Sequence, residues 1–338
     1  MIRVGIIGGS GYTGSDLLRL MLGHPDAEVE VVTSRKLAGK KLYDIHGGIR
    51  GLTELEFEGL DYDKLSERVD MVFTAVPHGE AMKYAPKLLD EGLKVVDLSA
   101  DYRLKKDVFE EVYGIAHTGF REAVFGLPEL HPEVRDASLV ANPGCYSTGA
   151  ILALAPLAEM EVMERVVVDS KSGISGAGTK ATAVSHYPNL AQNVQAYKIT
   201  DHRHNAEIIQ ELGRLDPEVK IYFTPHVIPA IRGILTTAHV FLKGEIDIEE
   251  IRAGYEAFYK DKFFIRILGP GAVPQLGHVR GSNFCDIGLY PEKGADRLVV
   301  LSALDNMVKG ASGAAVQNMN LACGLSETSG LAHGGLFP

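Results

Sequence analysis

One cysteine lies where a strand is expected to turn into a helix. The apolar run 139–141 predicts a strand, which Pro143 and Gly144 bring to an end. The apolar run 151–157 predicts a buried helix, so Cys145 lies just before or within its first turn. Unpaired backbone N–H groups at a helix N-terminus favour a thiolate over a thiol. Cys145 is therefore a candidate nucleophile, and the alternative is a small buried residue in a turn.

Two further segments could complete the chemistry of a thiolate. The segment 202–204, His-Arg-His, precedes an expected helix with Asn205 as its N-cap. A histidine near a helix N-terminus tends to stay neutral, which suits a base; structural hydrogen bonding is the alternative. A metal site is not expected, because His-x-His lacks a third and fourth ligand at a familiar spacing. Arg103 is a candidate clamp for a phosphate or carboxylate, and its alternative is a surface salt bridge to Asp101.

The beginning of the chain carries a dinucleotide-binding pattern. A strand is expected at 3–7, and an amphipathic helix follows the glycine-rich segment 8–14. Within that segment Gly9, Gly11 and Gly14 form G-x-G-x-x-G, which lets backbone N–H groups approach a pyrophosphate at the helix N-terminus. The pattern lies between a strand and a helix, as dinucleotide binding requires, so a mere glycine-rich turn is the weaker reading.

The residues after the second expected strand, 29–33, favour one nicotinamide cofactor over the other. An acidic residue at this point would hold the ribose 2′-hydroxyl of NAD. The chain has Ser34, Arg35 and Lys36 instead, and a hydroxyl with two cations suits a 2′-phosphate. The sequence therefore predicts NADP (as NADPH), and a solvated basic loop is the alternative.

The 338 residues predict two domains of different architecture. In the first half, strands alternate with helices, which predicts a parallel, doubly wound sheet. In the second half fewer helices separate the strands, which predicts an α+β domain with an antiparallel or mixed sheet. The expected strands of the second half are 165–170, 220–224, 233–242, 263–267, 284–290 and 297–301. The segment 172–178 predicts a second anion- or cofactor-contacting loop with exposed backbone donors, and a final helix is expected at 306–321.

Composition excludes several classes of partner. The formal net charge of −10 argues against nucleic acid and anionic membranes, which require a basic surface. The apolar runs are too short to span a bilayer, and the start of the chain has no signal-peptide pattern. The 3 cysteines form neither a disulfide framework nor a metal cluster. These features predict a cytoplasmic protein, and two-fold pairing is the expected assembly.

Six motifs together resemble the N-acetyl-gamma-glutamyl-phosphate reductase family of arginine biosynthesis. They are Gly-Gly-Ser-Gly-Tyr-Thr-Gly at 8–14, Ser-Ala-Asp-Tyr-Arg at 99–103, Asn-Pro-Gly-Cys-Tyr at 142–146, Ser-Gly-Ile-Ser-Gly-Ala-Gly at 172–178, His-Arg-His at 202–204 and Arg-Gly-Ile-Leu at 232–235. The wider superfamily includes aspartate-semialdehyde dehydrogenase, which shares the glycine-rich start, the cysteine and the Ser-Gly-Ala-Gly loop. His-Arg-His favours the reductase. One departure is Asn205-Ala206-Glu207, where many members have Thr-Pro-Glu.

The resemblance implies a fold and a reaction. The fold is a Rossmann-type NADP-binding domain, 1–144 plus 310–338, and a catalytic and dimerisation domain with a mixed sheet, 145–309, like glyceraldehyde-3-phosphate dehydrogenase. The final helix would pack back on the nucleotide domain, and subunits would pair through the 145–309 sheet as a homodimer or homotetramer. The reaction is reduction of N-acetyl-5-glutamyl phosphate by NADPH, which gives the 5-semialdehyde and phosphate through a Cys145 thioester.

The resemblance also implies roles for individual residues. Cys145 would be the nucleophile, and His204, or less directly His202, the acid–base residue. The substrate would contact Arg103, Asn142, Tyr197 and His202. The cofactor would contact Gly9, Ser10, Gly11, Tyr12, Thr13, Gly14, Ser34, Arg35, Gly176 and Asn306, with Asn306 near the nicotinamide.

Three other functions stay open from sequence. The same chemistry could act on an aminoadipyl phosphate of lysine biosynthesis, because a pocket discriminates one methylene by only about 1–3 kcal/mol. It could also act on aspartyl phosphate. A non-enzymatic NADP-binding sensor is the third alternative, and an unreactive Cys145 would support it.

Overall fold

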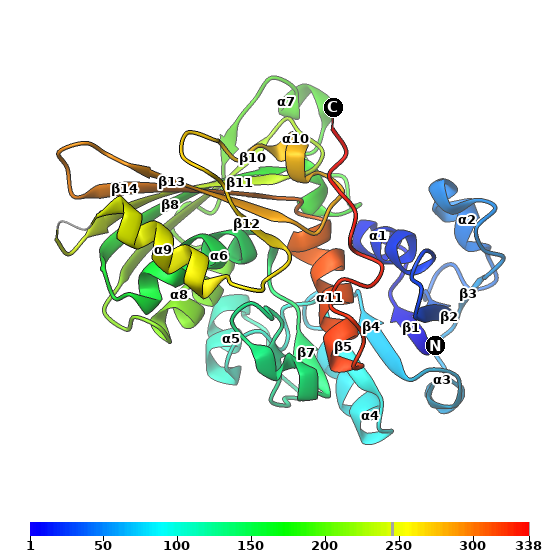
Figure 1. Ribbon diagram of the computed structural model, residues 1–338. Coiled ribbons are helices and arrows are strands. Elements are labelled where there is room, and N and C mark those ends of the chain that lie inside the picture. The colour runs from blue at the N-terminus through cyan, green and yellow to red at the C-terminus, as the bar shows by residue number, and fades with distance from the viewer. Residues whose placement is uncertain (245–246, 338) are drawn as a thin grey trace. The chain divides into compact units, whose positions relative to one another are not determined.

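The computed structural model describes residues 1–244 and 247–337, which form two compact units (Figure 1). The first unit comprises Met1–Pro143 and Ala311–Ala332, and the second comprises Gly144–Gly310 and the tail from His333. The sequence-based boundaries placed this tail in the first unit. It lies instead against α10 (Leu276–Val279) of the second, where the Leu336 N–H donates to the carbonyl of Arg280 at 2.7 Å.

The first unit contains a seven-stranded sheet in which every pair of neighbouring strands is parallel. The strand order is β3-β2-β1-β4-β5-β7-β6. The strands are β1 (Ile2–Ile7), β2 (Ala27–Thr33), β3 (Phe57–Glu58), β4 (Met71–Thr74), β5 (Lys94–Asp97), β6 (Val124–Phe125) and β7 (Leu139–Ala141). The predicted parallel sheet is confirmed, and the short edge strands β3 and β6 are additional.

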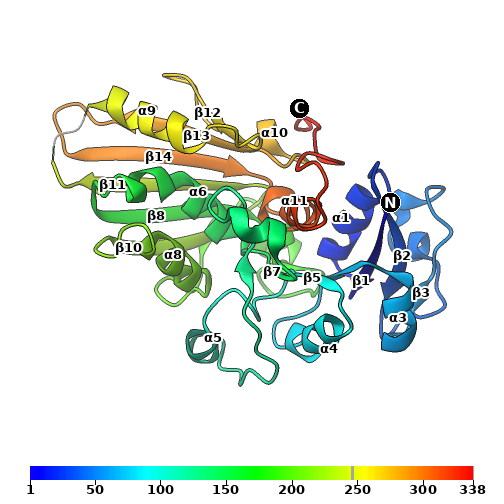
Figure 2. The same ribbon diagram turned by 60° about the horizontal axis from the view of Figure 1, so that its bottom comes forward.

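Helices cover both faces of this sheet, because the strand order reverses direction at β1 (Figure 2). The helices are α1 (Tyr12–Met21), α2 (Leu42–Ile45), α3 (Tyr62–Arg68), α4 (Ala85–Asp90), α5 (Lys106–Tyr113) and α11 (Gly313–Ala322). The helices α1 and α11 contact each other, whereas α3 and α4 lie on the other face. The expected helix around 81–90 is divided into a 3₁₀ turn, Ala81–Lys83, and α4, with Pro86 in the first turn of α4.

The second unit contains a mixed seven-stranded sheet, as the sequence predicts. Its order is β12-β13-β14-β11-β8-β10-β9, with β8 and β10 parallel and β11 antiparallel to both of its neighbours. The strands are β8 (Met163–Gly173), β9 (Gln195–Ala196), β10 (Lys220–Ile228), β11 (Ile234–Leu242), β12 (Ile265–Ile267), β13 (Cys285–Pro291) and β14 (Arg297–Leu304). The helices are α6 (Cys145–Glu159), α7 (Tyr187–Leu190), α8 (His204–Gly213), α9 (Ile248–Phe258) and α10.

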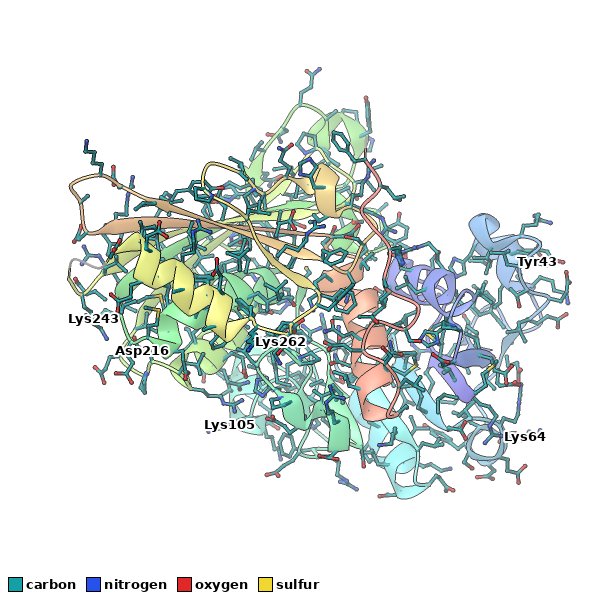
Figure 3. All side chains as sticks on the ribbon, viewed as in Figure 1. Tyr43, Lys64, Lys105, Asp216, Lys243 and Lys262 are labelled. Carbon is teal, nitrogen blue, oxygen red and sulfur yellow. The ribbon has the colours of Figure 1, made fainter. Side chains whose placement is uncertain are left out.

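Helix α6 is the centre of the second unit. Its residues Tyr146–Ala158 are all buried, between the sheet and the helices α8 and α9. A helix that is apolar on every side requires such surroundings, since water would otherwise meet one of its faces. At the periphery, the side chains of Asp216 and Lys243 pair at 3.4 Å (Figure 3) and join the segment after α8 to the end of β11.

Two tyrosines satisfy backbone groups of α6 near an internal proline. Pro156 has no N–H, so the carbonyl of Leu152, four residues earlier, loses its helical donor. The hydroxyl of Tyr259 donates to that carbonyl at 2.6 Å, and the hydroxyl of Tyr255 donates to the carbonyl of Ala153 at 2.5 Å. Both hydroxyls are buried, and the bond from Tyr259 replaces the missing backbone bond where water has no access.

Replacing Tyr259 by phenylalanine is expected to lower the free energy of unfolding by about 1–3 kcal/mol, because the buried carbonyl of Leu152 would lose its donor. Urea denaturation followed by circular dichroism measures the change. Tyr187→Phe is the matched control, because Tyr187 is 79% exposed and its substitution should shift stability by no more than about 0.5 kcal/mol. Equal midpoints for the two variants would contradict this account of α6.

Candidate active site

Helix α6 begins at Cys145, so the thiol lies in the first turn, as the sequence predicts. Gly144 is the N-cap in an extended conformation, and no side chain caps the helix. The N–H groups of a first helical turn have no partner within the helix, and they present partial positive charge there. Cys145 is a free cysteine and partly exposed, as a reactive thiol must be.

Two glycines let other elements approach Cys145 closely. A Cβ at Gly144 would lie 2.5 Å from Nε2 of His204, so the imidazole rests on the backbone just before the cysteine. A Cβ at Gly310 would lie 2.8 Å from Cβ of Cys145, so the 305–310 turn contacts the thiol-bearing residue itself. Side chains at either position would displace these neighbours. The cysteine is thus held between the N-terminus of α8 and the 305–310 turn.

A buried carboxylate fixes the start of α6, and sequence reasoning missed its role. One oxygen of Glu207, which is fully buried, accepts the Gly144 N–H at 2.8 Å and the Ser147 hydroxyl at 2.6 Å. Glu207 follows His204 by three residues on α8, so both lie on the same face of the helix. That i, i+3 spacing was the available signal. Glu207 is a positioning residue for the turn that holds Cys145.

His202, Tyr197 and Tyr146 form a directional chain of hydrogen bonds. Nδ1 of His202 accepts the N–H of His204 at 3.2 Å, which leaves the proton on Nε2, 3.3 Å from the Tyr197 hydroxyl. That hydroxyl donates to Tyr146 at 3.4 Å, and Tyr146 donates to the carbonyl of His226 at 2.8 Å. The rings of His202 and His204 meet edge to face, with centroids 4.8 Å apart.

The members of this chain are neutral at pH 7. Burial, with the cations Arg203 and Lys198 nearby, lowers the pKa of His202 to about 4. Burial raises the pKa of Tyr197 to about 12 and that of Tyr146 well above its usual range. Because His202 uses both ring nitrogens within the protein, His204 is the histidine that faces the start of α6.

The expected N-cap of α8 was wrong. The helix begins at His204 with Arg203 as its N-cap, and Asn205 lies inside the first turn. The sequence pattern favoured asparagine because its side chain commonly caps a helix. Here neighbouring rings determine the start instead, since His204 must reach Gly144 and His202 must accept its N–H.

The 172–178 loop is held differently from the prediction. Its expected exposed donors at Gly173, Ile174 and Ser175 bond to carbonyls of the 230–233 loop at 2.9–3.1 Å. Asn306, which is buried, accepts the Gly233 N–H at 2.7 Å and donates to the Ser175 hydroxyl at 2.9 Å. A Cβ at Gly176 would lie 3.6 Å from the amide nitrogen of Asn306. The structure therefore brings Gly176 and Asn306 together.

In the first unit, Arg103 and Asn142 are brought together. Arg103 is buried and donates to the carbonyls of Asn142, at 2.7 Å, and Leu98, at 2.9 Å. The alternative of a salt bridge to Asp101 is wrong, because that carboxylate accepts backbone N–H groups from the 79–82 turn instead. The guanidinium thus ties the end of β5 to the residue after β7.

The glycine-rich turn fits a dinucleotide pyrophosphate. Gly14 packs so closely on Gly9 that a Cβ would lie 2.4 Å from the Gly9 carbonyl, and Gly8 has a φ of +87°. By contrast, a Cβ at Gly11 would meet no described heavy atom within 4 Å. Gly11 is the N-cap of α1, and no side chain caps that helix. The N–H groups of its first turn therefore lie beside open space, where a pyrophosphate could bind.

Ser34 and Arg35 lie just beyond β2, on the same side of the sheet as this turn. The side chain of Arg35 is 78% exposed, and its guanidinium lies 3.6 Å from the carboxylate of Glu80. An exposed pair of this kind contributes little to stability. Turning Arg35 from Glu80 toward a ligand would therefore cost the protein little folding free energy.

Two other kinds of site are absent from the part of the chain that the structure describes. Within 1–244 and 247–337, no cluster of three or more His, Cys, Asp or Glu side chains is arranged to hold a metal ion. No helix in the described part of the chain is long and apolar enough to cross a membrane.

Known families match both halves of the chain. The NAD-binding domain of semialdehyde dehydrogenases matches residues 3–138, and the semialdehyde dehydrogenase dimerisation domain matches 145–306. An N-acetyl-gamma-glutamyl-phosphate reductase of Methanothrix thermoacetophila is 61% identical over 98% of both chains. The chain belongs to the N-acetyl-gamma-glutamyl-phosphate reductase family. The reductase of Archaeoglobus fulgidus is 57% identical over the full length of both. The predicted family is thus confirmed.

Solved structures confirm the fold of this reductase-family chain. Aspartate-semialdehyde dehydrogenase II of Vibrio cholerae, in complex with ASA, has a TM-score of 0.73 at 20% identity and covers 96% of this chain and 98% of its own. The Candida albicans enzyme with NADP has a TM-score of 0.70 at 17% identity, over 95% and 98% of the chains. With the domain matches, these support an α/β fold with a nicotinamide-binding unit.

Substitution of Gly11 by alanine separates cofactor binding from folding. We expect Gly11→Ala to raise the Kd for NADPH at least tenfold, or about 1.4 kcal/mol, because its methyl group would enter the space left for the pyrophosphate. The melting temperature should stay within the range of Gly47→Ala, a matched control whose Cβ also meets no described atom within 4 Å. Titration of NADPH fluorescence and thermal unfolding measure both. An unchanged Kd would show that the pyrophosphate binds elsewhere.

Proposed function

We propose that this protein reduces N-acetyl-5-glutamyl phosphate to N-acetylglutamate 5-semialdehyde with NADPH, and releases phosphate, through a thioester on Cys145. The observation that carries the proposal is the placement of Cys145 at the start of α6, with His204 resting on the preceding Gly144. Family membership supports the substrate, since relatives at 57–61% identity bear the reductase name. The route belongs to arginine biosynthesis.

The residues divide the proposed reaction between a nucleophile and an acid–base residue. Neutral His204 takes the proton of the Cys145 thiol, the thiolate attacks the acyl carbon, the bond from carbon to phosphate oxygen breaks, and His204 returns the proton to the departing phosphate. Bound NADPH supplies a hydride to the thioester carbon. The resulting alkoxide on Cys145 expels the thiolate as the aldehyde forms, and the thiolate takes a proton from solvent. First-turn N–H groups of α6 stabilise the thiolate at both ends of the cycle.

Other residues would hold the reactants. Arg103 and Asn142 in the first unit, and Tyr197 and His202 in the second, would contact the substrate. The cofactor would lie along Gly9, Ser10, Gly11, Tyr12, Thr13 and Gly14, with Ser34 and Arg35 at the 2′-phosphate and Gly176 and Asn306 at the nicotinamide end. In the chain from His202 to Tyr146 each proton is already donated within the protein, so His202 and Tyr197 would meet the substrate as neutral groups that line its site.

The open face of the second sheet would pair with a second copy of the chain. On the face opposite α6, one row of residues crosses five strands of this sheet. The row consists of Tyr222, Val167, His239, Val299 and Tyr290. Tyr222 and Val167 are 55% and 37% exposed, whereas the alternate residues Phe223 and Val168 are buried. The match to a dimerisation domain supports a homodimer or homotetramer. The 3 free cysteines fit the reducing cytoplasm, where we expect the protein to work.

The reaction can be tested in reverse. N-acetylglutamate semialdehyde, NADP and phosphate should yield NADPH, and Cys145→Ser should lower the rate by roughly a thousandfold or more. Cys323→Ser, a change at another partly exposed free thiol, should leave the rate unchanged. NADPH absorbance at 340 nm follows the reaction.

Each other outcome of that assay points to a rival. NADPH formation that needs no phosphate would indicate a hydrolytic aldehyde dehydrogenase. If the glutamyl compound gives no NADPH but the aminoadipyl or aspartyl semialdehyde does, the aldehyde that reacts would be assigned as the substrate instead. Inactivity with all three aldehydes, together with an unreactive Cys145, would support the sensor.

The preference for NADP is tested at Arg35. We expect Arg35→Ala to lower kcat/KM for NADPH about tenfold, or about 1.4 kcal/mol, and to leave kcat/KM for NADH unchanged, because only NADPH carries the 2′-phosphate. Glu80→Gln removes the partner of Arg35 without removing the cation, so it should not weaken NADPH binding. Equal losses for both cofactors would contradict the assignment of Arg35.

A further inference from the structure

The Arg-Gly-Ile-Leu motif at 232–235 contributes no residue to the proposed reaction. Arg232 lies in the loop between β10 and β11, which is bonded to the 172–178 loop. The Ile174 N–H donates to the carbonyl of Ala230 at 2.9 Å, and the Ser175 N–H donates to that of Ile231 at 3.1 Å. A Cβ at Gly173 would lie 2.6 Å from the Ile231 oxygen. The loop that carries Arg232 is therefore held rigidly against the loop that contains Gly176.

A buried carboxylate orients the Arg232 side chain. Nη1 of Arg232 lies 3.6 Å from Oδ1 of Asp305, whose side chain is fully buried, whereas that of Arg232 is 29% exposed. Asp305 also accepts the N–H groups of Met307, at 2.8 Å, and Gly281, at 2.7 Å. A carboxylate with several backbone donors keeps a fixed place. The guanidinium is thus aimed by its buried partner while it still reaches the surface.

The same turn connects Arg232 to the nucleophile. The carbonyl of Asp305 accepts the Gly310 N–H at 2.9 Å, and Gly310 is the residue that packs on Cys145. His204 approaches from Gly144, the other neighbour of the cysteine. All of these residues belong to the second unit. Cys145 therefore has the imidazole of His204 against the residue before it, and the turn that begins with Asp305, the partner of Arg232, against its own Cβ.

We propose that Arg232 is a substrate-recognition residue that binds an oxyanion of the acyl phosphate. This inference rests on the proposed function, which supplies a substrate with two anionic groups, a phosphate at the reacting end and a carboxylate at the other. A planar guanidinium matches either group with two parallel hydrogen bonds. Asp305 is the corresponding positioning residue, because it orients Arg232 and joins it to the turn beside Cys145.

The test compares two aldehydes in the reverse assay, N-acetylglutamate semialdehyde and 4-acetamidobutanal, which lacks the carboxylate. If Arg232 binds the substrate carboxylate, Arg232→Gln should raise the KM for N-acetylglutamate semialdehyde roughly tenfold to a hundredfold. The KM values for 4-acetamidobutanal and for phosphate should then stay unchanged. A phosphate partner predicts a KM for phosphate raised by a similar factor with both aldehydes. Either pattern supports the proposal and identifies the group that Arg232 binds.

Arg214→Gln is the matched control. Its guanidinium also lies 3.6 Å from a buried carboxylate, that of Glu211, but at the far end of α8. The control should change none of the three KM values. A fall in kcat that is equal for both aldehydes in Arg232→Gln, with all KM values unchanged, would reduce Arg232 to a structural role and overturn the proposal. Unchanged kinetics would overturn it as well.

A second variant covers a failure of Arg232→Gln to fold. Arg232→Lys keeps the charge and loses the planar fork, so it should raise the same KM severalfold. Unchanged KM values for both aldehydes and for phosphate in that variant would overturn the proposal. Failure of the wild type to form NADPH from N-acetylglutamate semialdehyde and phosphate would count against the proposed function instead. The two failures are thus distinguishable.

Discussion

The close approach of two elements to the backbone around one cysteine is the constraint on which the second unit depends. His204 can rest on residue 144, and the 305–310 turn can reach Cys145, only because glycine stands at 144 and 310. Each contact depends on the absence of a Cβ, since an atom 2.5–2.8 Å from its neighbour must displace it. Filling that space with a side chain would move His204 away from Cys145 without changing either of these residues.

The burial of α6 makes these approaches stable. A helix enclosed along Tyr146–Ala158 cannot shift to relieve a poor contact at its first residue, because its whole length is packed. Even the carbonyl freed by Pro156 is bonded, through the hydroxyl of Tyr259. At the other end Glu207 accepts the N–H of Gly144. The position of the thiol is thus fixed by one buried helix with its polar groups satisfied at both ends.

Most of the fold, and the place of Cys145 in a first helical turn, could be predicted from the sequence, for physical reasons that also explain the misses. Strand and helix periods, and the glycines of 8–14, are local signals that depend on few distant contacts. The N-cap of α8 was misassigned, because contacts with Gly144 and His202 override the local preference of Asn205. The donors of 172–178 were expected to be exposed, but the 230–233 loop accepts them, and no local pattern encodes a partner some sixty residues away. The roles of Glu207 and Asp305 were missed for a related reason. The i, i+3 spacing of Glu207 from His204 indicates a shared helix face, but not the distant Gly144 N–H that Glu207 accepts.

The two missed carboxylates share a physical logic. Glu207 and Asp305 are both fully buried. Glu207 accepts the backbone N–H of Gly144, the residue before Cys145, and Asp305 accepts that of Met307 in the 305–310 turn. A buried carboxylate that loses its donors leaves an uncompensated charge, which costs free energy. Each carboxylate therefore stays bonded to its turn. Glu207 thereby fixes the residue before Cys145, and Asp305 fixes the turn beside it. Both neighbours of the thiol are thus set by carboxylates bonded to the backbone, whereas the recognition that we propose for an anionic substrate depends on a cation, the guanidinium of Arg232.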